Sequence, residues 1–290
     1  MSVRTRYIDG VDIQGRIARA GSSLTPAERK VATKLLDDPQ GVAYQTVSTI
    51  AAAAGTGVAS VVRLANKLGF DGFSALQAAA QKELNDRLRP AAHRIREGGV
   101  SPTLARHVEV EVANVERTVG GADGAILALA VARLTSLRGR VLVVSGDASR
   151  GVALQFCRDL DALRPGVVLV DGNQVATQQT LAHVDTNDVV VAIDLRRYDR
   201  WVVEAVRRAV EATAWCLAVT DSVLSPLAVA ADATLIVHAD ADGPFDSHVG
   251  TLALLNLLVA GVAAKGRRTA TARLERAEAA WRAGDALTET

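Results

Sequence analysis

The chain has 290 residues, of which 49% are hydrophobic and 22% are charged, a balance typical of folded globular proteins and not of disordered chains. This length favours two domains. The net charge is only +1, so the total gives no sign of nucleic-acid binding. The distribution is more informative: residues 1–100 carry a net charge of +5, residues 101–264 a net charge of −6 and residues 265–290 a net charge of +2. A basic part followed by an acidic part fits a DNA-binding domain fused to a second domain, and it also fits ordinary surface variation.

The cysteines and apolar segments exclude several classes of protein. Cys157 and Cys216 lie in apolar segments, where small buried side chains are expected, and their spacing fits neither a zinc site nor a disulfide framework. No signal-peptide pattern opens the chain. The longest apolar stretch, residues 251–264, is shorter than the roughly 20 residues that cross a bilayer. We therefore expect a cytoplasmic protein that binds no metal, no cofactor and no membrane.

The N-terminal segment, residues 1–89, is predicted to be all helical. Thr25, Pro26 and Glu28 mark a helix start, because Thr25 can cap the first turn, Pro26 suits the first helical position and Glu28 can reach back to the capping residue. Pro39 is expected to end this helix. Apolar periodicity predicts three more helices, over residues 47–54, 58–68 and 74–90.

Residues 47–68 have the form of a helix-turn-helix. Its two helices are joined by a short turn that contains glycine, here Gly55-Thr56-Gly57. The second helix turns Val61, Leu64 and Leu68 toward the domain core. If this helix enters a major groove, its N-terminal residues meet base edges, Arg63 suits guanine and Ser60 suits a phosphate. The candidate DNA-binding residues are Val58, Ala59, Ser60, Arg63, Asn66 and Lys67. The same pattern also fits a small helical domain that binds another protein.

The rest of the chain alternates between short Val- and Ile-rich runs and helical stretches, which predicts a parallel sheet covered by helices on both faces. The strands are expected at residues 141–144, 167–170, 189–193, 217–219 and 235–237. The helices are expected at residues 104–119, 125–137, 152–163, 201–212, 245–264 and 268–283. Two glycines and two prolines mark the domain boundary. The predicted domains are an all-α helix-turn-helix domain (1–89), a linker (90–102), an α/β three-layer domain (103–264) and a C-terminal helix (265–290).

Two loops are candidate ligand-binding elements, because open α/β sheets bind ligands at the carboxyl ends of their strands. The first contains Gly146 and Ser149 and opens a helix, whose N-terminus could hold an anion. Ser149 could equally be only a helix cap.

The second loop contains Asp194, Arg196, Arg197 and Tyr198. Its arginines either hold an anionic ligand or pair on the surface with Asp194 or Asp199.

Three stretches of the N-terminal segment, residues 24–39, 51–55 and 60–77, closely resemble the N-terminal domain of the RpiR/MurR-type regulators. The most specific residues are Val62-Arg63, Lys67-Leu68-Gly69-Phe70 and Gly72-Phe73. In this family the domain is joined to a sugar isomerase (SIS) domain, which fits residues 101–264, so the resemblance covers nearly the whole chain. It implies a homodimeric or homotetrameric regulator that binds a palindromic operator in double-stranded DNA and responds to a phosphosugar.

The chain departs from this family in both candidate sites. Many members have a serine at the position of Gly57 and polar residues near Val58 and Ala59, so this recognition helix instead offers apolar contacts to thymine methyl groups. Typical SIS domains cradle the sugar phosphate with a serine-rich loop, which this chain lacks: Arg197 replaces its glycine. In the first loop Asp147 replaces a glycine, and only Ser149 carries over. Either the ligand is still anionic and held by arginines, or its class has changed.

SIS domains also occur in sugar isomerases, which need a positioned base. The candidates His183, His238 and His248 are isolated in the sequence, and His248 is the best placed because Asp246 is near it. The attached helix-turn-helix favours a regulator that is not an enzyme. We expect control by a small anionic metabolite, either a sugar phosphate or a sugar acid, bound by Gly146, Ser149, Asp194, Arg196, Arg197 and Tyr198. The alternative is an enzyme like a sugar-phosphate isomerase.

Overall fold

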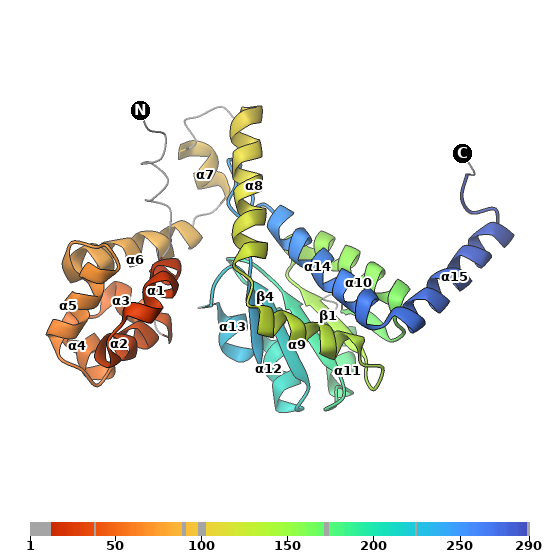
Figure 1. The fold of residues 1–290 in the computed structure, drawn as a ribbon, viewed down its shortest axis with the longest axis horizontal. Coiled ribbons are helices and arrows are strands. Elements are labelled where there is room, and N and C mark those ends of the chain that lie inside the picture. The colour runs from red at the N-terminus through yellow and green to blue at the C-terminus, as the bar shows by residue number, and fades with distance from the viewer. Residues whose placement is uncertain are drawn as a thin grey trace. The chain divides into compact units, whose positions relative to one another are not determined.

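The computed structural model describes residues 13–37, 39–88, 91–97, 103–170, 174–223 and 225–288. The chain divides into two compact units, Met1–Arg89 and Pro90–Thr290, whose helices and strands are labelled in Figure 1. Among the described residues no single helix is both long and apolar enough to cross a membrane, and only three sharply bent helix pairs reach that length and composition together.

The first unit is helical throughout its described part. Its core is formed by fully buried side chains such as Val31, Leu64 and Leu76. The elements are α1 (Ile13–Ala20), the 3-10 turn η2 (Gly21–Ser23), α2 (Pro26–Asp37), α3 (Pro39–Tyr44), α4 (Val47–Ala53), α5 (Val58–Lys67) and α6 (Gly72–Leu88).

The start of α2 is built as the sequence predicts. The backbone N–H of Thr25 donates to Glu28 Oε2 at 2.8 Å, and the N–H of Glu28 donates to Thr25 Oγ1 at 3.3 Å. This reciprocal pair satisfies two donors that an uncapped helix would leave exposed. Helix α2 ends at Asp37, but Pro39 begins another helix, α3. Proline suits this first helical position because no intrahelical partner awaits its missing N–H.

The second unit is a five-stranded parallel sheet with helices on both faces. Its strands are β1 (Val141–Ser145), β2 (Val167–Val170), β3 (Val189–Ile193), β4 (Trp215–Thr220) and β5 (Ala233–Ile236), in the order β2-β1-β3-β4-β5. Its helices are α7 (Ala91–Glu97), α8 (Leu104–Gly120), α9 (Gly124–Thr135), α10 (Arg150–Leu163), α11 (Gln174–Ala182), α12 (Arg200–Glu211), α13 (Pro226–Ala230), α14 (Val249–Lys265) and α15 (Arg267–Ala283), with a 3-10 turn, η3 (Asp147–Ser149), before α10.

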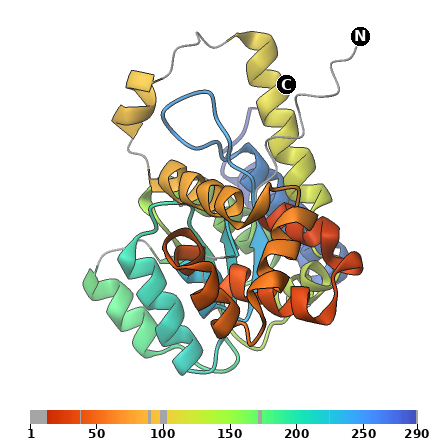
Figure 2. The same ribbon diagram turned by 90° about the vertical axis from the view of Figure 1, so that its left-hand side faces the viewer.

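Each face of the sheet has its own apolar core, because alternate strand residues point to opposite sides. On one face Val143 and Val191 pack with buried residues of α9, α10 and α14. On the other face Leu142 and Val190 pack with buried residues of α11, α12 and α13. Figures 1 and 2 show these two helical layers with the sheet between them. The prediction of a parallel sheet covered on both sides is confirmed.

Some boundaries differ from the sequence prediction. Helix α14 begins at Val249 and not at residue 245, because Phe245 is 74% exposed and belongs to a loop. Helices α11 and α13 were not predicted. The predicted linker contains the helix α7, while its residues 90 and 98–102 lie outside the described residues.

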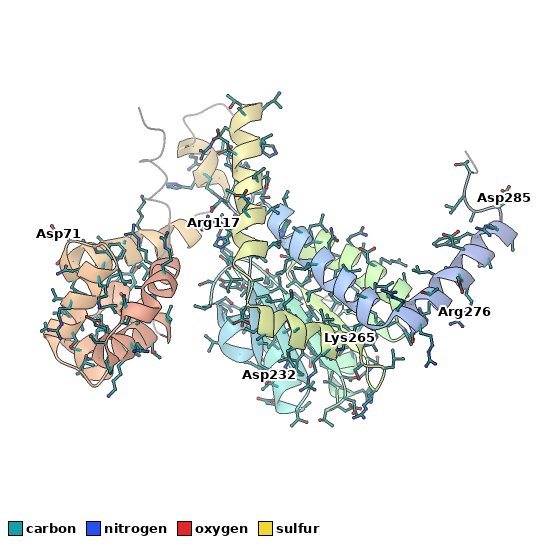
Figure 3. The ribbon with its side chains drawn as sticks, in the orientation of Figure 1. Asp71, Arg117, Asp232, Lys265, Arg276 and Asp285 are labelled. Atoms are coloured by element: carbon teal, nitrogen blue, oxygen red, sulfur yellow. The ribbon has the colours of Figure 1, made fainter. Side chains whose placement is uncertain are left out.

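Helix α8 holds the segment that leads from β5 to α14. The side chain of Asn114 donates to the carbonyl of Asp240 at 2.8 Å and accepts from its N–H at 3.0 Å. Thr118 Oγ1 accepts from the N–H of His238 at 2.8 Å, and Arg117, labelled in Figure 3, donates to the carboxylate of Asp240 at 2.9 Å. These bonds fix the path of the chain just before α14.

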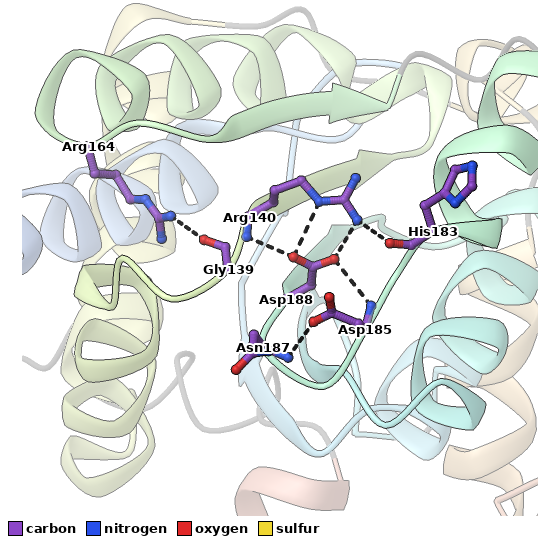
Figure 4. Close-up of polar contacts among 7 residues, drawn as sticks. All are labelled: Gly139, Arg140, Arg164, His183, Asp185, Asn187 and Asp188. Carbon is purple, nitrogen blue, oxygen red and sulfur yellow. Dashed lines mark hydrogen bonds and ion pairs between the residues drawn. The ribbon is translucent and has the colours of Figure 1, made fainter.

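At the amino ends of the strands, a buried carboxylate joins β1 to β3 (Figure 4). Asp188 accepts hydrogen bonds from the backbone and side chain of Arg140, the shortest at 2.5 Å, and from the N–H of Asp185 at 3.3 Å. Hydrogen bonds from Arg140 help to lower the pKa of Asp188 against the opposing effect of burial. This cluster fixes β1 beside β3 and thereby positions the loops at their other ends.

Candidate DNA-binding and ligand-binding sites

The turn between α4 and α5 has helix-turn-helix geometry. The chain bends by 101° between the two helices, within the roughly 90–120° typical of this motif. Gly55, two residues after the end of α4, has a φ of +61°, a conformation that glycine adopts without strain. The N–H of Gly55 donates to the carbonyl of Ala52 at 3.0 Å, and the N–H of Thr56 donates to that of Ala51 at 2.9 Å. This paired arrangement is the Schellman motif, and it directs the chain straight into α5.

Helix α5 presents an exposed face that includes Val58, Ala59 and Arg63, while Val61 and Leu64 are fully buried. Val58 is 41% exposed. This face therefore offers apolar groups and one guanidinium group to a binding partner.

Ser60 lies on the same helix but is buried. Its Oγ accepts a hydrogen bond of 3.1 Å from Arg63 Nη2. In this arrangement Ser60 orients Arg63 and is not itself open to a phosphate.

Asn66 and Lys67 also make contacts within the first unit. Asn66 Oδ1 accepts from the N–H of Gly72 at 2.9 Å, which fixes the start of α6. Lys67 Nζ donates to the carbonyl of Ser23 and to Glu28 Oε2, both at 2.8 Å. The hydrogen bond from Lys67 lowers the pKa of Glu28 to about 2, with help from the N–H of Thr25. The pair ties the end of α5 to the start of α2, a role that local spacing does not reveal.

The two predicted ligand loops lie side by side in the second unit, since β1 pairs with β3. The strand order reverses at this pair, which is where sheets of this order bind ligands. The N–H of Gly146 donates to the carbonyl of Ile193 at 3.2 Å, and the N–H of Asp147 donates to Asp199 Oδ2 at 2.9 Å. A Cβ atom at position 146 would overlap the carboxylate of Asp194. Only glycine allows this close approach.

Ser149 is fully buried at the start of α10. Its side chain makes no capping hydrogen bond, so the alternative that Ser149 only caps the helix is wrong. Its Oγ has no hydrogen-bond partner within the described part of the chain. A buried hydroxyl without a partner is rare in folded proteins and calls for an explanation.

Asp194 holds the second loop together. It is 4% exposed, and its carboxylate accepts from the N–H of Leu195 at 3.0 Å and from that of Asp199 at 2.7 Å. Burial raises the pKa of Asp194 to about 7, and the charges of Asp199 and Asp221 add to the shift. The carboxyl group thus titrates near neutral pH.

The two arginines of this loop have different environments. Arg196 Nε donates to Asp246 Oδ1 at 2.7 Å, and the same oxygen accepts from Arg94 Nη1 of α7 at 2.8 Å. Arg196 therefore pairs, but not with the two aspartates considered from the sequence.

Arg197 is exposed and forms no ion pair with any described residue. Its φ is +69°, unusual for a residue other than glycine. The hydroxyl of Tyr198 donates to Asp221 Oδ1 at 2.7 Å. This bond holds the Tyr198 side chain against the residue that follows β4.

The three histidines do not form one cluster. His183 lies beside Arg140 at the amino ends of the strands (Figure 4), while His238 follows β5 and His248 precedes α14. Burial lowers the pKa of His248, opposed by the charge of Asp246 and by a hydrogen bond to the backbone of Ala148. Within the described ranges, no three His, Cys, Asp or Glu side chains are grouped to hold a metal ion.

Comparison with known proteins agrees with both parts of the fold. A family model for the helix-turn-helix domain of the rpiR family matches residues 11–87, and a model for the SIS domain matches residues 134–261. An uncharacterized HTH-type transcriptional regulator of Caldanaerobacter subterraneus subsp. tengcongensis is 27% identical over 264 residues, which cover 88% of this chain and 91% of that protein.

Two solved structures share the fold. The sugar isomerase domain of an RpiR transcription factor from Sphaerobacter thermophilus is 28% identical, with a TM-score of 0.55, over 60% of this chain and 97% of that one. The NanR protein of Vibrio vulnificus, complexed with ManNAc-6P, is 19% identical, with a TM-score of 0.55, over 93% of this chain and 98% of that one.

A helix-turn-helix unit followed by an SIS domain defines a two-domain transcriptional regulator. The chain belongs to the RpiR family of HTH-type regulators that carry an SIS domain.

The raised pKa of Asp194 gives a pH dependence of stability with a definite sign. The folded state holds this proton more tightly than the unfolded state does, so the contribution of Asp194 is largest below pH ~4 and falls as the pH rises toward about 7. In urea unfolding between pH 4 and 8, the stability difference between wild type and Asp194→Asn should shrink up to about pH 7 and then stay constant.

Asp188→Asn is the matched control, because the pKa of Asp188 is lowered. Its stability deficit should stay constant between pH 4 and 7 and shrink only below about pH 4. If the deficit of Asp194→Asn stays constant or grows between pH 4 and 7, the raised pKa of Asp194 is wrong.

Proposed function

We propose that this transcriptional regulator binds a palindromic operator as a homo-oligomer, and that a small anionic metabolite derived from a sugar controls the binding. The observation that carries the ligand proposal is the hydroxyl of Ser149, which is buried without a partner where β1 and β3 end. Such a group sits where ligands of this sheet type bind, and Arg197 in the neighbouring loop suits the anionic part of a ligand.

In this proposal Arg63 is the main polar side chain that contacts the bases of DNA. It is exposed on α5 and held by Ser60, and a guanidinium group can pair with both acceptors of a guanine. Val58 and Ala59 supply apolar contact to thymine methyl groups. Asn66 and Lys67, whose polar atoms bond within the unit, act mainly by fixing α5.

Arg197 and Ser149 are the principal ligand groups in this proposal. Arg197 is exposed and its guanidinium suits a phosphate or a carboxylate. Its backbone conformation is one that usually costs energy, and such residues cluster at functional sites. The NanR structure, whose ligand is ManNAc-6P, supports a sugar-derived ligand but does not identify it.

Asp246 offers a route between the ligand and the linker. It accepts from Arg196 in the ligand loop and from Arg94 in α7, the first helix after residue 89. An anion that draws Arg196 away leaves Asp246 to Arg94 alone, so ligand binding changes how firmly α7 is held. Linkage requires the reverse effect as well.

A homo-oligomer is supported by the surface of α8. Leu104, Val108 and Val112 recur every fourth residue and are 89%, 59% and 48% exposed. Residues at this spacing share one helix face. A second copy of the chain would cover this apolar stripe, and a two-fold dimer matches a palindromic operator.

We propose no catalytic activity. The four curated relatives that match are named as HTH-type transcriptional regulators, and His183 lies at the amino ends of the strands, away from the ligand loops. Conversion of an aldose phosphate to its ketose by the purified chain would favour the isomerase alternative.

The DNA-binding proposal is tested with Arg63→Ala in the full chain. This change should weaken binding to the DNA upstream of its own coding region by about 1–3 kcal/mol, and binding to random DNA by less. Lys67→Met is the comparison, because it should lower the melting temperature of the protein and weaken its binding to both DNAs by the same factor. Equal losses for Arg63→Ala on both DNAs would limit Arg63 to phosphate contact, and a wild type that does not bind its upstream DNA would remove the proposal.

The ligand proposal is tested by calorimetric titration of sugar phosphates and sugar acids. Arg196→Ala combined with Arg197→Ala should weaken a bound ligand about tenfold or more, about 1.4 kcal/mol. Arg197→Ala alone should account for most of this loss, since Arg196 is already paired. A ligand that binds the double variant with unchanged affinity would show that the arginines take no part.

A further inference from the structure

Three buried polar atoms lie at the N-terminal ends of α10 and α14 without any hydrogen-bond partner among the described residues. They are Ser149 Oγ, His248 Nδ1 and Thr251 Oγ1. The side chains of Ser149 and Thr251 are fully buried. Buried polar groups almost always find partners, and an orphaned one lowers stability. Three unpartnered polar atoms at the starts of two neighbouring helices indicate that their partner is a bound ligand.

The two helices that carry these atoms are neighbours. Helices α10 and α14 pack against each other, as Figure 1 shows, and their buried residues belong to one apolar core. Ser149 precedes the buried stripe of α10 that continues with Ala153 and Phe156. Thr251 begins the buried stripe of α14 that continues with Leu254 and Leu258. Each hydroxyl therefore lies at the start of the buried face of its helix.

His248 connects the starts of the two helices. It is the residue before α14, one helical turn from Thr251, and it hydrogen-bonds to the backbone of Ala148. Since its Nδ1 has no partner, that bond is made by Nε2. Burial keeps the imidazole neutral near pH 7, so Nδ1 carries a lone pair and acts as an acceptor. A serine or threonine hydroxyl can donate or accept.

One acceptor and two hydroxyls suit an uncharged hydroxyl group, which must donate one hydrogen bond and can accept others. The exposed N–H groups of two helix starts add further donors at this place. A buried ammonium group would find only one firm acceptor here, and a bare anion would face the lone pair of His248.

We infer that Ser149, His248 and Thr251 form a subsite for a hydroxyl group of the sugar-derived effector. This inference rests on the proposed function, and it adds His248 and Thr251 to the ligand-binding residues. It places the hydroxylated part of the ligand against α14 and its acidic part toward Arg197. The site selects a polyhydroxylated acid over a small inorganic anion.

The chain offers matched controls for Thr251→Val, which replaces a hydroxyl by a methyl group of similar shape. Thr118 is equally buried but its Oγ1 accepts from His238, so Thr118→Val removes a bonded hydroxyl. Thr177 on α11 is buried and unpartnered but lies on a helix outside the proposed site.

The first arm measures urea unfolding of the full chain without ligand. Thr251→Val should leave the unfolding midpoint unchanged or raise it, because no hydrogen bond is lost, whereas Thr118→Val should lower it. A midpoint for Thr251→Val that falls as far as that of Thr118→Val overturns the inference, since Thr251 would then have a structural partner.

The second arm measures calorimetric affinity for 6-phosphogluconate, glucose 6-phosphate, gluconate and inorganic phosphate. Thr251→Val should weaken a sugar-containing probe about tenfold and leave inorganic phosphate unchanged, while Thr177→Val should change neither. If Ser149→Ala weakens the binding of a sugar-containing probe and Thr251→Val does not, the subsite is wrong but the proposed effector stands. No binding of any probe to wild type would overturn the proposed effector and the subsite with it.

Discussion

The close packing of Gly146 against the carboxylate of Asp194 is the contact on which the ligand-binding end of the sheet depends. It requires a residue without a Cβ atom after β1 and a buried carboxylate after β3. Asp194 in turn binds two backbone N–H groups of its own loop, so both loops are fixed relative to the sheet. Helix α10 starts at Arg150, four residues after Gly146, and Ser149 just before it is buried.

The same principle governs the DNA-binding unit. Most polar groups near α5 are used to fix the helix: Ser60 holds Arg63, Asn66 bonds to Gly72 and Lys67 pairs with Glu28. Few side chains remain free for a partner, and they lie on one exposed face. In both units a rigid frame positions a small number of functional groups, which is the usual requirement for specific recognition.

The architecture could be predicted from the sequence, because the spacing of apolar residues indicates which side chains are buried. The five apolar runs are the five parallel strands, and the loops of Gly146 and Asp194 follow the carboxyl ends of two of them, as predicted. Alternation of strands and helices does not fix the strand order, so the pairing of β1 with β3 comes from the structure. The capping box of Thr25 and Glu28 was also predictable, since its partners are three residues apart.

Partners far apart in the chain could not be predicted in the same way. Lys67 meets Glu28 across 39 residues, and Arg94 meets Asp246 across 152. Local spacing says that such side chains are polar, but not whether they face solvent or each other. The same limit explains why the sequence offered only Asp194 and Asp199 as possible partners of Arg196, which instead pairs with Asp246.

Asp246 bonds to the ligand loop and to α7, the first helix after residue 89. We propose that a ligand at the β1 and β3 loops acts through this carboxylate and changes the affinity for DNA. The most direct measurement is the affinity of the full chain for its upstream DNA with and without 6-phosphogluconate, glucose 6-phosphate and ManNAc-6P, for wild type and for Ser149→Ala. The account predicts that at least one compound changes wild-type affinity by about fivefold or more, the lower range of allosteric coupling, and that Ser149→Ala loses this response. Unchanged affinity with every compound, or an equal response in Ser149→Ala, would contradict it.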